Sequence, residues 1–324
     1  MDAEELALFR DAVTRAVEAQ RGDALEAALE DLGWSDALEA DPASAVSVLF
    51  ECQGAAHTTS FALDRVLAGA LGERGDPATS EAVVLPRLRQ HGAPGHLDGD
   101  RCTVHGLGTA AMARAGRVLV VAQGPPDAGH VVAHLDVGTL ELRPVRGLDP
   151  DLALVEVTGA FEAGAAVPVP EGDGWDGAVA LGQLALGHEL VGAARTMLDL
   201  ARQHALGRIQ FGRPIASFQA VRHRLAESLV AVESAAGLLA AAWEEPTPAT
   251  AAMAKGFAGR SARTVAKHAQ QVLAGLGFTT EHPLHEFVRR TLVLDQLLGA
   301  GSVLTKELGV EVLRTGSLPA TLPL

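Results

Sequence analysis

The first part of the chain carries its apolar residues at helical spacing. Within residues 2–31 they recur every three or four positions, and residues 43–53 and 59–71, separated by Gly54, show the same period. This period predicts amphipathic helices. The apolar positions of the first stretch are Leu6, Phe9, Val13, Val17, Leu25, Leu29 and, just beyond it, Leu32.

The pattern changes in the middle of the chain. Residues 72–99 contain Pro77, Pro86, Pro94 and several glycines, which predicts connecting or edge structure. Short runs of β-type residues follow, each bounded by Gly, Pro or Asp, and they predict a small antiparallel β unit. These runs are 101–107, 117–122, 130–135, 140–145 and 152–157.

From Trp175 the helical pattern returns and persists. Residues 177–204 are apolar on nearly every face, which is typical of a helix buried inside a bundle. Ser217 can cap a helix over 218–244, and Thr247-Pro248 can open the next one, which runs to about Leu273. With further helices over 286–298 and 303–313, this half predicts a bundle of four or five antiparallel helices.

The sequence therefore predicts an α+β protein that is mostly α. We expect an N-terminal helical domain over 1–80, a small central β-domain over 81–172 and a C-terminal helical bundle over 173–324.

Composition narrows the function classes. The formal net charge is −14 and there is no Lys/Arg-rich tract, so we expect no nucleic-acid surface and expect local cations to hold any anionic ligand. The two cysteines, Cys52 and Cys102, lack C-x-x-C spacing, and the N-terminus is acidic where a signal peptide would be basic. Glycine and glutamine interrupt the apolar runs, so we expect no membrane span and a cytoplasmic protein.

Common catalytic templates are missing. The sequence contains no G-x-G-x-x-G, P-loop or G-x-S-x-G pattern, and Gly106-Leu-Gly108 is interpreted as a turn. The histidines of residues 281–286 lack H-E-x-x-H spacing, so a solvated helix entrance is favoured over a metal site. His188-Glu189 is interpreted as a satisfied interior pair, with an acid/base role as the alternative if burial raises the pKa of the carboxyl group.

Two segments remain open to two interpretations. Arg208 follows a long helix, where it could be a cation stabilised by the helix dipole or a bidentate grip on a phosphate. Residues 270–278 place two amides before several glycines, which suits either a helix C-cap or a surface against a flat or phosphorylated ligand.

Together these two segments resemble the acyl-CoA dehydrogenase family. Residues 205–219, A-L-G-R-I-Q-F-G-R-P-I-A-S-F-Q, are similar to its R-x-x-F-G-x-x-I-x-x-F-Q turn. Residues 271–283, followed by Arg289-Arg290, are similar to its Q-x-x-G-G-x-G-F…P…R segment. The order of helices, β unit and helices agrees with the family along the whole chain, and residues 175–315 carry the motifs.

The resemblance implies a fold of N-terminal helices, a β-domain and a C-terminal four-helix bundle. It also implies FAD-dependent α,β-dehydrogenation of an acyl-CoA thioester, in which a carboxylate removes the α-proton and the flavin accepts the β-hydride. In the family these two segments contact the adenosine diphosphate part of an FAD that the neighbouring subunit mainly holds.

Carried over, the resemblance assigns the cofactor contacts. Arg208 would pair with the diphosphate, flanked by Gln210 and Phe211, and Gln271 with Gly275 would support the ribose-phosphate end. Ala274 stands where the family has the first glycine of its pair.

The departures from the family are equally informative. Its T-E-P-x-x-G-S-D and W-I-T/S patterns, which line the flavin and acyl pocket, are absent from residues 81–170. Leu298 and Gly182 occupy the two positions that supply a catalytic base, and neither can take a proton. Glu189, about two helical turns from Gly182, is the weak substitute.

The resemblance is therefore to the degenerate subunit of a bacterial heterotetrameric acyl-CoA dehydrogenase, such as those that act on steroid side-chain thioesters. We expect a homologous catalytic partner, an acyl-CoA substrate, and half the usual number of FAD molecules. The alternatives are a homo-oligomeric flavoenzyme that uses Glu189 as its base and a scaffold subunit that does not touch FAD.

Overall fold

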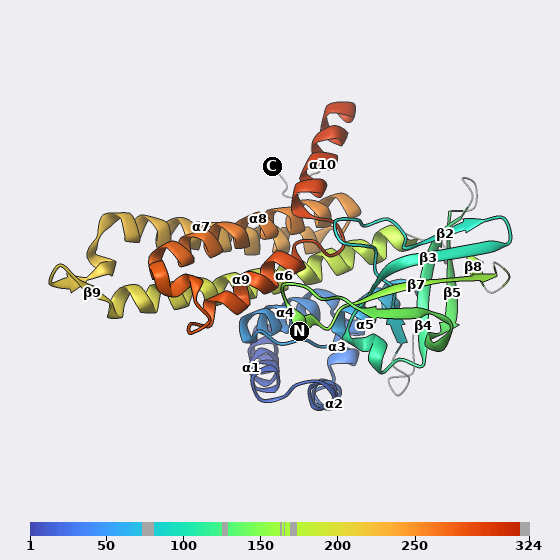
Figure 1. Ribbon diagram of the computed structural model, residues 1–324, viewed down its shortest axis with the longest axis horizontal. Helices are drawn as coiled ribbons and strands as arrows, with labels where there is room; N and C mark the ends of the chain where they lie inside the picture. The colour runs from blue at the N-terminus through green and yellow to red at the C-terminus, as the bar shows by residue number, and fades with distance from the viewer. Residues whose placement is uncertain (73–80, 125–128, 163, 165, 169–173, 318–324) are drawn as a thin grey trace.

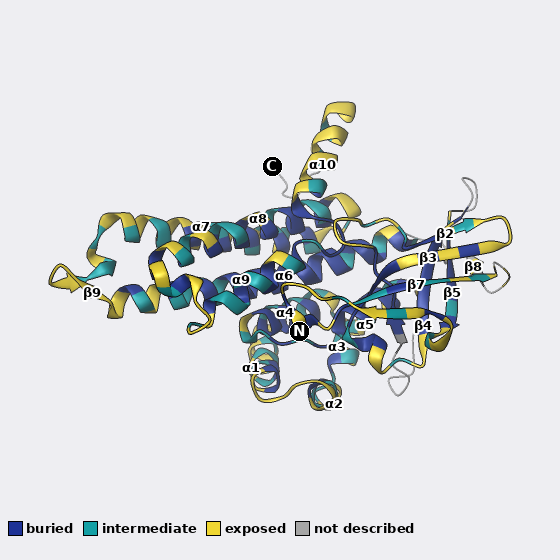
Figure 2. Cartoon of the chain, viewed as in Figure 1, coloured by how far each residue is buried: buried dark blue, intermediate teal, exposed yellow. Residues whose placement is uncertain are grey.

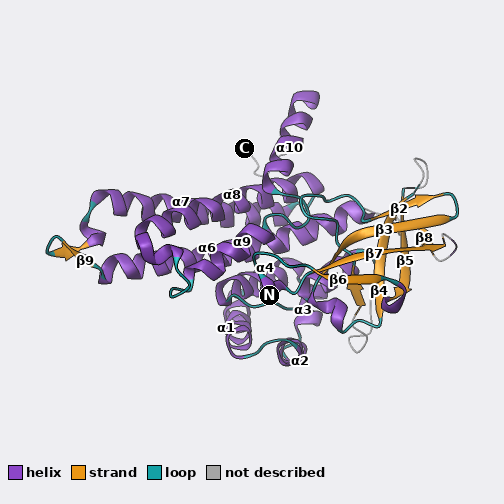
Figure 3. Cartoon of the chain, viewed as in Figure 1, coloured by secondary structure: helices purple, strands orange, loops and turns teal. Residues whose placement is uncertain are grey.

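The computed structural model describes residues 1–72, 81–124, 129–162, 164, 166–168 and 174–317. Helices occupy both ends of the chain and strands occupy its middle (Figure 3). The mostly helical α+β class is confirmed. The expected domain boundaries at 80/81 and 172/173 fall in or beside residues outside the described ranges and stay predictions.

The N-terminal part consists of five short helices. They are α1 (Ala3–Ala19), α2 (Asp23–Asp31), α3 (Trp34–Ala40), α4 (Pro42–Ala56) and α5 (Ala62–Ala70). The continuous helical pattern of residues 2–31 is divided because the chain turns at Gly22, whose φ of 55° is in the region that favours glycine. Helix α3, which follows a second left-handed glycine at Gly33, was not predicted from the sequence.

The central strands form one mixed sheet. Its order is β6-β7-β3-β2-β4-β5-β8, and β1 also pairs with β4. The prediction of a purely antiparallel unit was wrong, because β4 runs parallel to both β1 and β2. The strands are β1 (Glu81–Val83), β2 (Gly95–Asp98), β3 (Arg101–Gly108), β4 (Arg117–Gln123), β5 (His130–Asp136), β6 (Glu141–Pro144), β7 (Val155–Glu162) and β8 (Ala166–Pro168).

The C-terminal half is a bundle built around one buried helix. Helix α6 is buried over most of its length between its neighbours (Figure 2), as its all-round apolar pattern predicts. The last helix, α10, packs only its first turns against α8 and then stands away from the bundle (Figure 1). The helices are α6 (Gly174–Gly207), α7 (Gln219–Glu244), α8 (Pro248–Leu273), α9 (Leu284–Leu294) and α10 (Gly301–Thr315).

Two glycines join the N-terminal helices to the bundle. A Cβ atom on Gly54 of α4 would overlap the backbone oxygen of Glu189, and one on Gly192 of α6 would overlap that of Glu51. The two backbones therefore touch where α4 crosses α6, and only residues without a side chain fit there.

Helix α7 is unusual in its composition. Of the helices in the described ranges, it alone is long and apolar enough to span a bilayer, by length and composition only. Such a helix is weak evidence for a membrane, since core helices pass the same test. Only 33% of the apolar stretch of α7 is buried, however, so its outer face is left uncovered.

The contact between α4 and α6 gives a first prediction. Gly192→Ala should lower the free energy of unfolding by about 3 kcal/mol, because a backbone oxygen cannot move aside as a flexible side chain would. Gly309→Ala is the control: it lies in exposed helix with nothing within 4 Å of the added atom, and should raise stability by about 1 kcal/mol. Denaturant unfolding measures both, and equal stabilities would contradict the contact.

Candidate functional site

The turn after α6 is a two-stranded hairpin that extends beyond the bundle. Strand β9 (Ile209–Gln210) pairs antiparallel with β10 (Arg213–Pro214). The two residues between them, Phe211 and Gly212, both have positive φ angles of 51° and 77°. This is the twist that two-residue hairpins prefer, although a phenylalanine adopts it only at a cost.

The hairpin presents aromatic and cationic groups to solvent. The Phe211 side chain is 91% exposed and meets the edge of the Phe218 ring at 6.0 Å between centroids. The Arg213 guanidinium stacks over the same Phe218 ring, 4.4 Å from its centroid. The hairpin tip is therefore a small aromatic surface that is exposed to solvent.

Arg208 lies at the base of this hairpin and is exposed. Its amide bonds the His204 carbonyl at 2.9 Å, which closes the last turn of α6. Its side chain forms no ion pair with any carboxylate in the described part of the chain. Burial, and then the positive charge of Arg208, hold the pKa of His204 below its ordinary value. The guanidinium is thus available to an anion from outside.

The end of α8 forms a second exposed surface. Gln271 and Gly275 both lie at the surface, and nothing would meet a Cβ atom on Gly275 within 4 Å. Ala274 begins the 3-10 turn η6 (Ala274–Phe278) with φ 53° and ψ −129°, a conformation suited to glycine. Phe278 closes the turn with its side chain 73% exposed.

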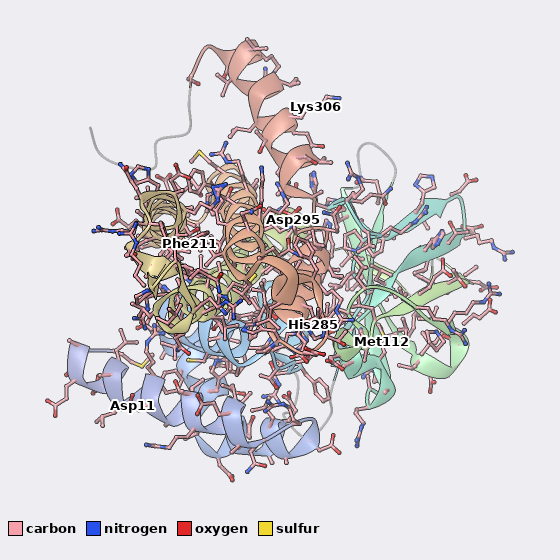
Figure 4. All side chains as sticks on the ribbon, turned by 60° about the vertical axis from the view of Figure 1, so that its left-hand side comes forward. Asp11, Met112, Phe211, His285, Asp295 and Lys306 are labelled. Atoms are coloured by element: carbon pink, nitrogen blue, oxygen red, sulfur yellow. The ribbon has the colours of Figure 1, made fainter. Side chains whose placement is uncertain are left out.

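The two surfaces lie at the same end of the molecule. Helix α7 runs back antiparallel to α6, and α8 returns, so α6 and α8 both end on the side that carries the hairpin (Figure 1). Figure 4 shows Phe211 on this bundle side, far from Met112 in the sheet. Residues over 60 positions apart are therefore gathered at one end.

The two positions at which a base was expected pack against each other in the core. A Cβ atom on Gly182 would lie 2.5 Å from Cδ1 of Leu298 and 2.9 Å from Cδ2 of Leu67. Leu298 is 0% exposed, and its carbonyl accepts a 2.9 Å bond from the Gln183 amide. Apolar side chains fill the space that a carboxylate would need.

The loop that carries Leu298 is anchored by a buried lysine. The Lys255 ammonium of α8 donates to the carbonyl of Asp295 at 3.0 Å and to those of Leu297 and Gly299. Burial lowers the pKa of Lys255 to about 7, against the opposing charge of Asp295. Leu298 itself has a φ of 50°, so the loop is held in a strained form.

Glu189 is fully engaged in a buried network. Its carboxylate accepts hydrogen bonds from Arg290 Nη1 at 3.3 Å and from the Gln53 side-chain amide at 3.1 Å. Arg290 also donates to Asp149 and to the Thr58 carbonyl at 2.7 Å. Burial raises the pKa of Glu189 to about 6, although Arg290 and Gln53 oppose the shift. The carboxylate therefore links α4, α6 and α9 through these hydrogen bonds and lies buried among them.

His188 has partners of its own. Trp243 Nε1 donates to its Nε2 at 3.0 Å, so Nδ1 carries the proton and donates to Glu51 at 3.0 Å. Burial works to raise the pKa of Glu51, but His188, Arg195 and Arg10 together hold it below its ordinary value. His188 and Glu189 are thus satisfied by different groups, and they form no dyad.

The histidines before α9 form a helix entrance. The Leu284 amide donates to His282 Nδ1 at 3.1 Å, and His285 Nδ1 lies 2.8 Å from the His282 carbonyl. Elsewhere in the described ranges, His57, Asp149 and Asp151 are close enough to share an ion. Arg290 already occupies Asp149, and its charge opposes a cation there.

Sequence reasoning missed the buried ionic residues. Lys255, Arg290 and Asp149 each lie in ordinary helical or loop patterns, and their partners are distant in sequence. The sequence offered one indication of such a residue, which is a Lys or Arg on the apolar face of a predicted helix. That indication does not identify the residue that pairs with it.

The sequence is similar to proteins of known family. Residues 173–313 match the family described as "Acyl-CoA dehydrogenase, C-terminal domain". The Acyl-CoA dehydrogenase IpdE2 of Mycobacterium tuberculosis is 29% identical over 331 residues, which cover 95% of this chain and 98% of that protein.

Solved structures share the fold along nearly the whole chain. A variant of the Tcur3481-Tcur3483 steroid ACAD superposes with a TM-score of 0.79 at 23% identity, covering 97% of this chain and 99% of that one. The ChsE4-ChsE5 complex from Mycobacterium tuberculosis gives 0.75 at 21% identity, with 98% and 99% covered.

Ala274 offers a test of backbone strain at the α8 surface. Ala274→Gly should raise the free energy of unfolding by about 1 kcal/mol, because glycine adopts this conformation without a Cβ clash. The same substitution at exposed, helical Ala7 should lower it by about 1 kcal/mol. Changes of the same sign at both positions would contradict the strained turn.

The Glu189 network predicts a pH dependence. Because the pKa of Glu189 is about 6 in the folded protein, this group holds its proton up to about that pH, whereas a glutamate in the unfolded chain releases it near pH 4.5. The free energy of unfolding should therefore fall by about 2 kcal/mol as the pH rises through this window. Glu189→Gln should remove that fall in denaturant unfolding from pH 4 to 7, and an unchanged slope would contradict it.

Proposed function

We propose that the chain is a member of the acyl-CoA dehydrogenase family and is the subunit that completes the FAD site of a homologous catalytic partner, supported by the family match over residues 173–313. The exposed end of the bundle carries this proposal, because it combines a cation that no carboxylate in the described ranges neutralises with exposed aromatic and glycine residues.

The adenosine diphosphate part of FAD fits this end of the chain. Arg208 would pair with the diphosphate, since no described carboxylate neutralises it and a chain of net charge −14 must hold an anion by local cations. Gly275 leaves its backbone open to close approach, and Gln271 offers an amide beside it. Gln210 and Phe211 flank the diphosphate from the hairpin.

The reactive end of FAD does not fit this chain. When bound, FAD would supply the acceptor for the hydride that leaves the acyl β-carbon. The position of the expected base is Leu298, sealed against Gly182 and Leu67, so this chain holds no group there that can take the α-proton. In this proposal the base and the flavin ring belong to the partner.

The relatives support a partner of the same kind. Two solved relatives carry paired names, Tcur3481-Tcur3483 and the ChsE4-ChsE5 complex, and the first is called a steroid ACAD. By analogy, this chain forms a cytoplasmic heterotetramer with a homologous subunit, holding half the usual FAD, and the complex dehydrogenates a steroid or lipid acyl-CoA thioester.

A self-sufficient enzyme with Glu189 as its base is the rival. Glu189 would then have to reach an α-proton, yet its oxygens are bound by Arg290 and Gln53 inside the chain. Loss of turnover in Glu189→Gln with an intact flavin spectrum would support this rival.

Arg208 provides the test of the proposed role. In the complex purified with its partner, Arg208→Ala should weaken FAD retention about tenfold or more, since a charge-assisted phosphate contact is lost. Arg202→Ala is the matched control, because Arg202 is also exposed on α6 but pairs with Asp199 at 2.7 Å. Flavin absorbance per complex after gel filtration measures both.

Three outcomes would contradict the proposal. Unchanged FAD retention in Arg208→Ala would leave a scaffold role. Equal losses in both variants would show a general effect of charge. A full complement of FAD with robust turnover in the chain purified alone would show that it needs no partner.

A further inference from the structure

Four basic side chains gather where α6 ends and α9 begins. His204 and Arg208 are four positions apart at the last turn of α6, so they lie on the same face of the helix. His282 precedes α9 and His285 is in its first turn. Helix α9 packs against α6 and starts on the side of the bundle that carries the hairpin (Figure 1). Together these four residues form the basic cluster.

The members of the basic cluster are close enough to act on one another's charge. Burial, and then the positive charge of Arg208, hold the pKa of His204 below its ordinary value. Burial, and then the charges of His204 and His285, lower the pKa of His282 in the same way. The end of α6 and the entrance of α9 therefore share one concentration of positive charge.

No carboxylate in the described ranges forms an ion pair with the basic cluster. Asp199 of α6 is bound by Arg202 at 2.7 Å. Glu286 of α9 acts on the pKa of His57 instead, which lies in the buried network. Glu281 is exposed and has no part in the pKa shift of the histidine that follows it. The turn η6, which packs against α9, carries no charged residue, so the cluster is left to an anion from outside.

The ring nitrogens of the cluster differ in what they can offer to a ligand. His282 Nδ1 accepts the Leu284 amide at 3.1 Å, so the proton of this neutral ring is on Nε2, which can donate. His285 Nδ1 donates to the His282 carbonyl at 2.8 Å. The ring of His204 forms no hydrogen bond or ion pair within the part of the chain that the structure describes. His282 is therefore a fixed donor, and His204 is free to gain a proton.

We propose that His204 and His282 join Arg208 in holding the FAD diphosphate, and that His204 takes up a proton when the cofactor binds. This inference rests on the proposed function, because it needs the diphosphate at Arg208. A diphosphate carries two anionic groups, and one guanidinium matches one of them. His204 supplies a second cation and His282 a further donor. The proton comes from solvent, and no bond of the cofactor changes.

An anion suits the basic cluster better than a metal ion does. Histidines bind metals through ring lone pairs, but backbone groups already occupy Nδ1 of both His282 and His285. Within the described ranges, the ligand atoms that come close enough to share an ion belong to another part of the chain. The charge of Arg208 would also repel a cation.

Proton uptake by His204 makes the affinity for FAD depend on pH. Without a ligand, Arg208 disfavours the charged form of His204. A bound diphosphate offsets the charge of Arg208 and adds negative charge, so it raises the pKa of His204. The affinity therefore increases as the pH falls, by about tenfold for each unit by which binding raises this pKa.

The test is the dissociation constant of FAD between pH 6 and pH 8 in the complex purified with its partner. Calorimetry in buffers of different ionisation enthalpy measures the protons taken up. The wild type should bind FAD about tenfold more tightly at pH 6 than at pH 8, with proton uptake. His204→Gln keeps a donor but cannot gain a proton, so it should lose most of this pH dependence. His105→Gln is the control, because the His105 ring binds Glu156 at 2.9 Å on the sheet, and it should keep the wild-type dependence.

His282→Asn tests the fixed donor without removing the helix entrance. The asparagine side chain can still accept the Leu284 amide, but it is shorter and loses the Nε2 donor. FAD should therefore bind about fivefold more weakly at every pH, with the pH dependence retained.

Several results would overturn this inference. They are a wild-type pH dependence in His204→Gln, a wild-type affinity in His282→Asn, and a loss of pH dependence in the His105→Gln control. Each of these leaves the proposed function standing if Arg208→Ala still loses FAD. Full FAD retention in Arg208→Ala would instead remove the proposed function, and this inference with it.

Discussion

The buried guanidinium of Arg290 fixes the arrangement on which the other features depend. It is 0% exposed, and it reaches Glu189 in α6, the Thr58 carbonyl after α4 and Asp149 in the segment before β7. The N-terminal helices, the segment before β7 and the C-terminal bundle are thus all bound to the same guanidinium. A buried charge that loses a partner costs about 3–5 kcal/mol, so these parts hold one relative placement.

The buried ionisable groups serve the fold and are not open to a substrate. Two buried groups with strongly shifted pKa values, Glu189 and Lys255, are both bound by groups of the same chain. Arg208, by contrast, lies exposed at the end of the bundle and pairs with no carboxylate in the described ranges, and Figure 2 shows exposed segments at that end. The shifted pKa values of Glu189 and Lys255 therefore reflect contacts that hold the fold together.

Much of the fold could be predicted from the sequence, since it depends on local patterns. The predicted bounds agree closely with the structure for α6, which is apolar on all sides, and for α8, which begins at Thr247-Pro248. They also agree for strands β3, β4 and β5. The parallel pairing of β4, the division at Gly22 and the free position of α10 could not be predicted, because they depend on tertiary contacts. Likewise, Leu298 and Gly182 could be identified from motifs, but their contact depends on the tertiary packing of α6 against the loop after α9. The roles of Arg208, Gln210, Phe211, Gln271 and Gly275 toward a cofactor stay predictions.

The lysine-held loop around Leu298 has an evolutionary consequence. Lys255 binds only backbone carbonyls there, so its hydrogen bonds to the loop do not depend on which side chain residue 298 carries. Residue 298 can therefore change in evolution without requiring a new path of the backbone. The hydrogen bonds of Lys255 stay the same whatever codon stands at position 298, so selection on this side chain and selection on the loop can act separately.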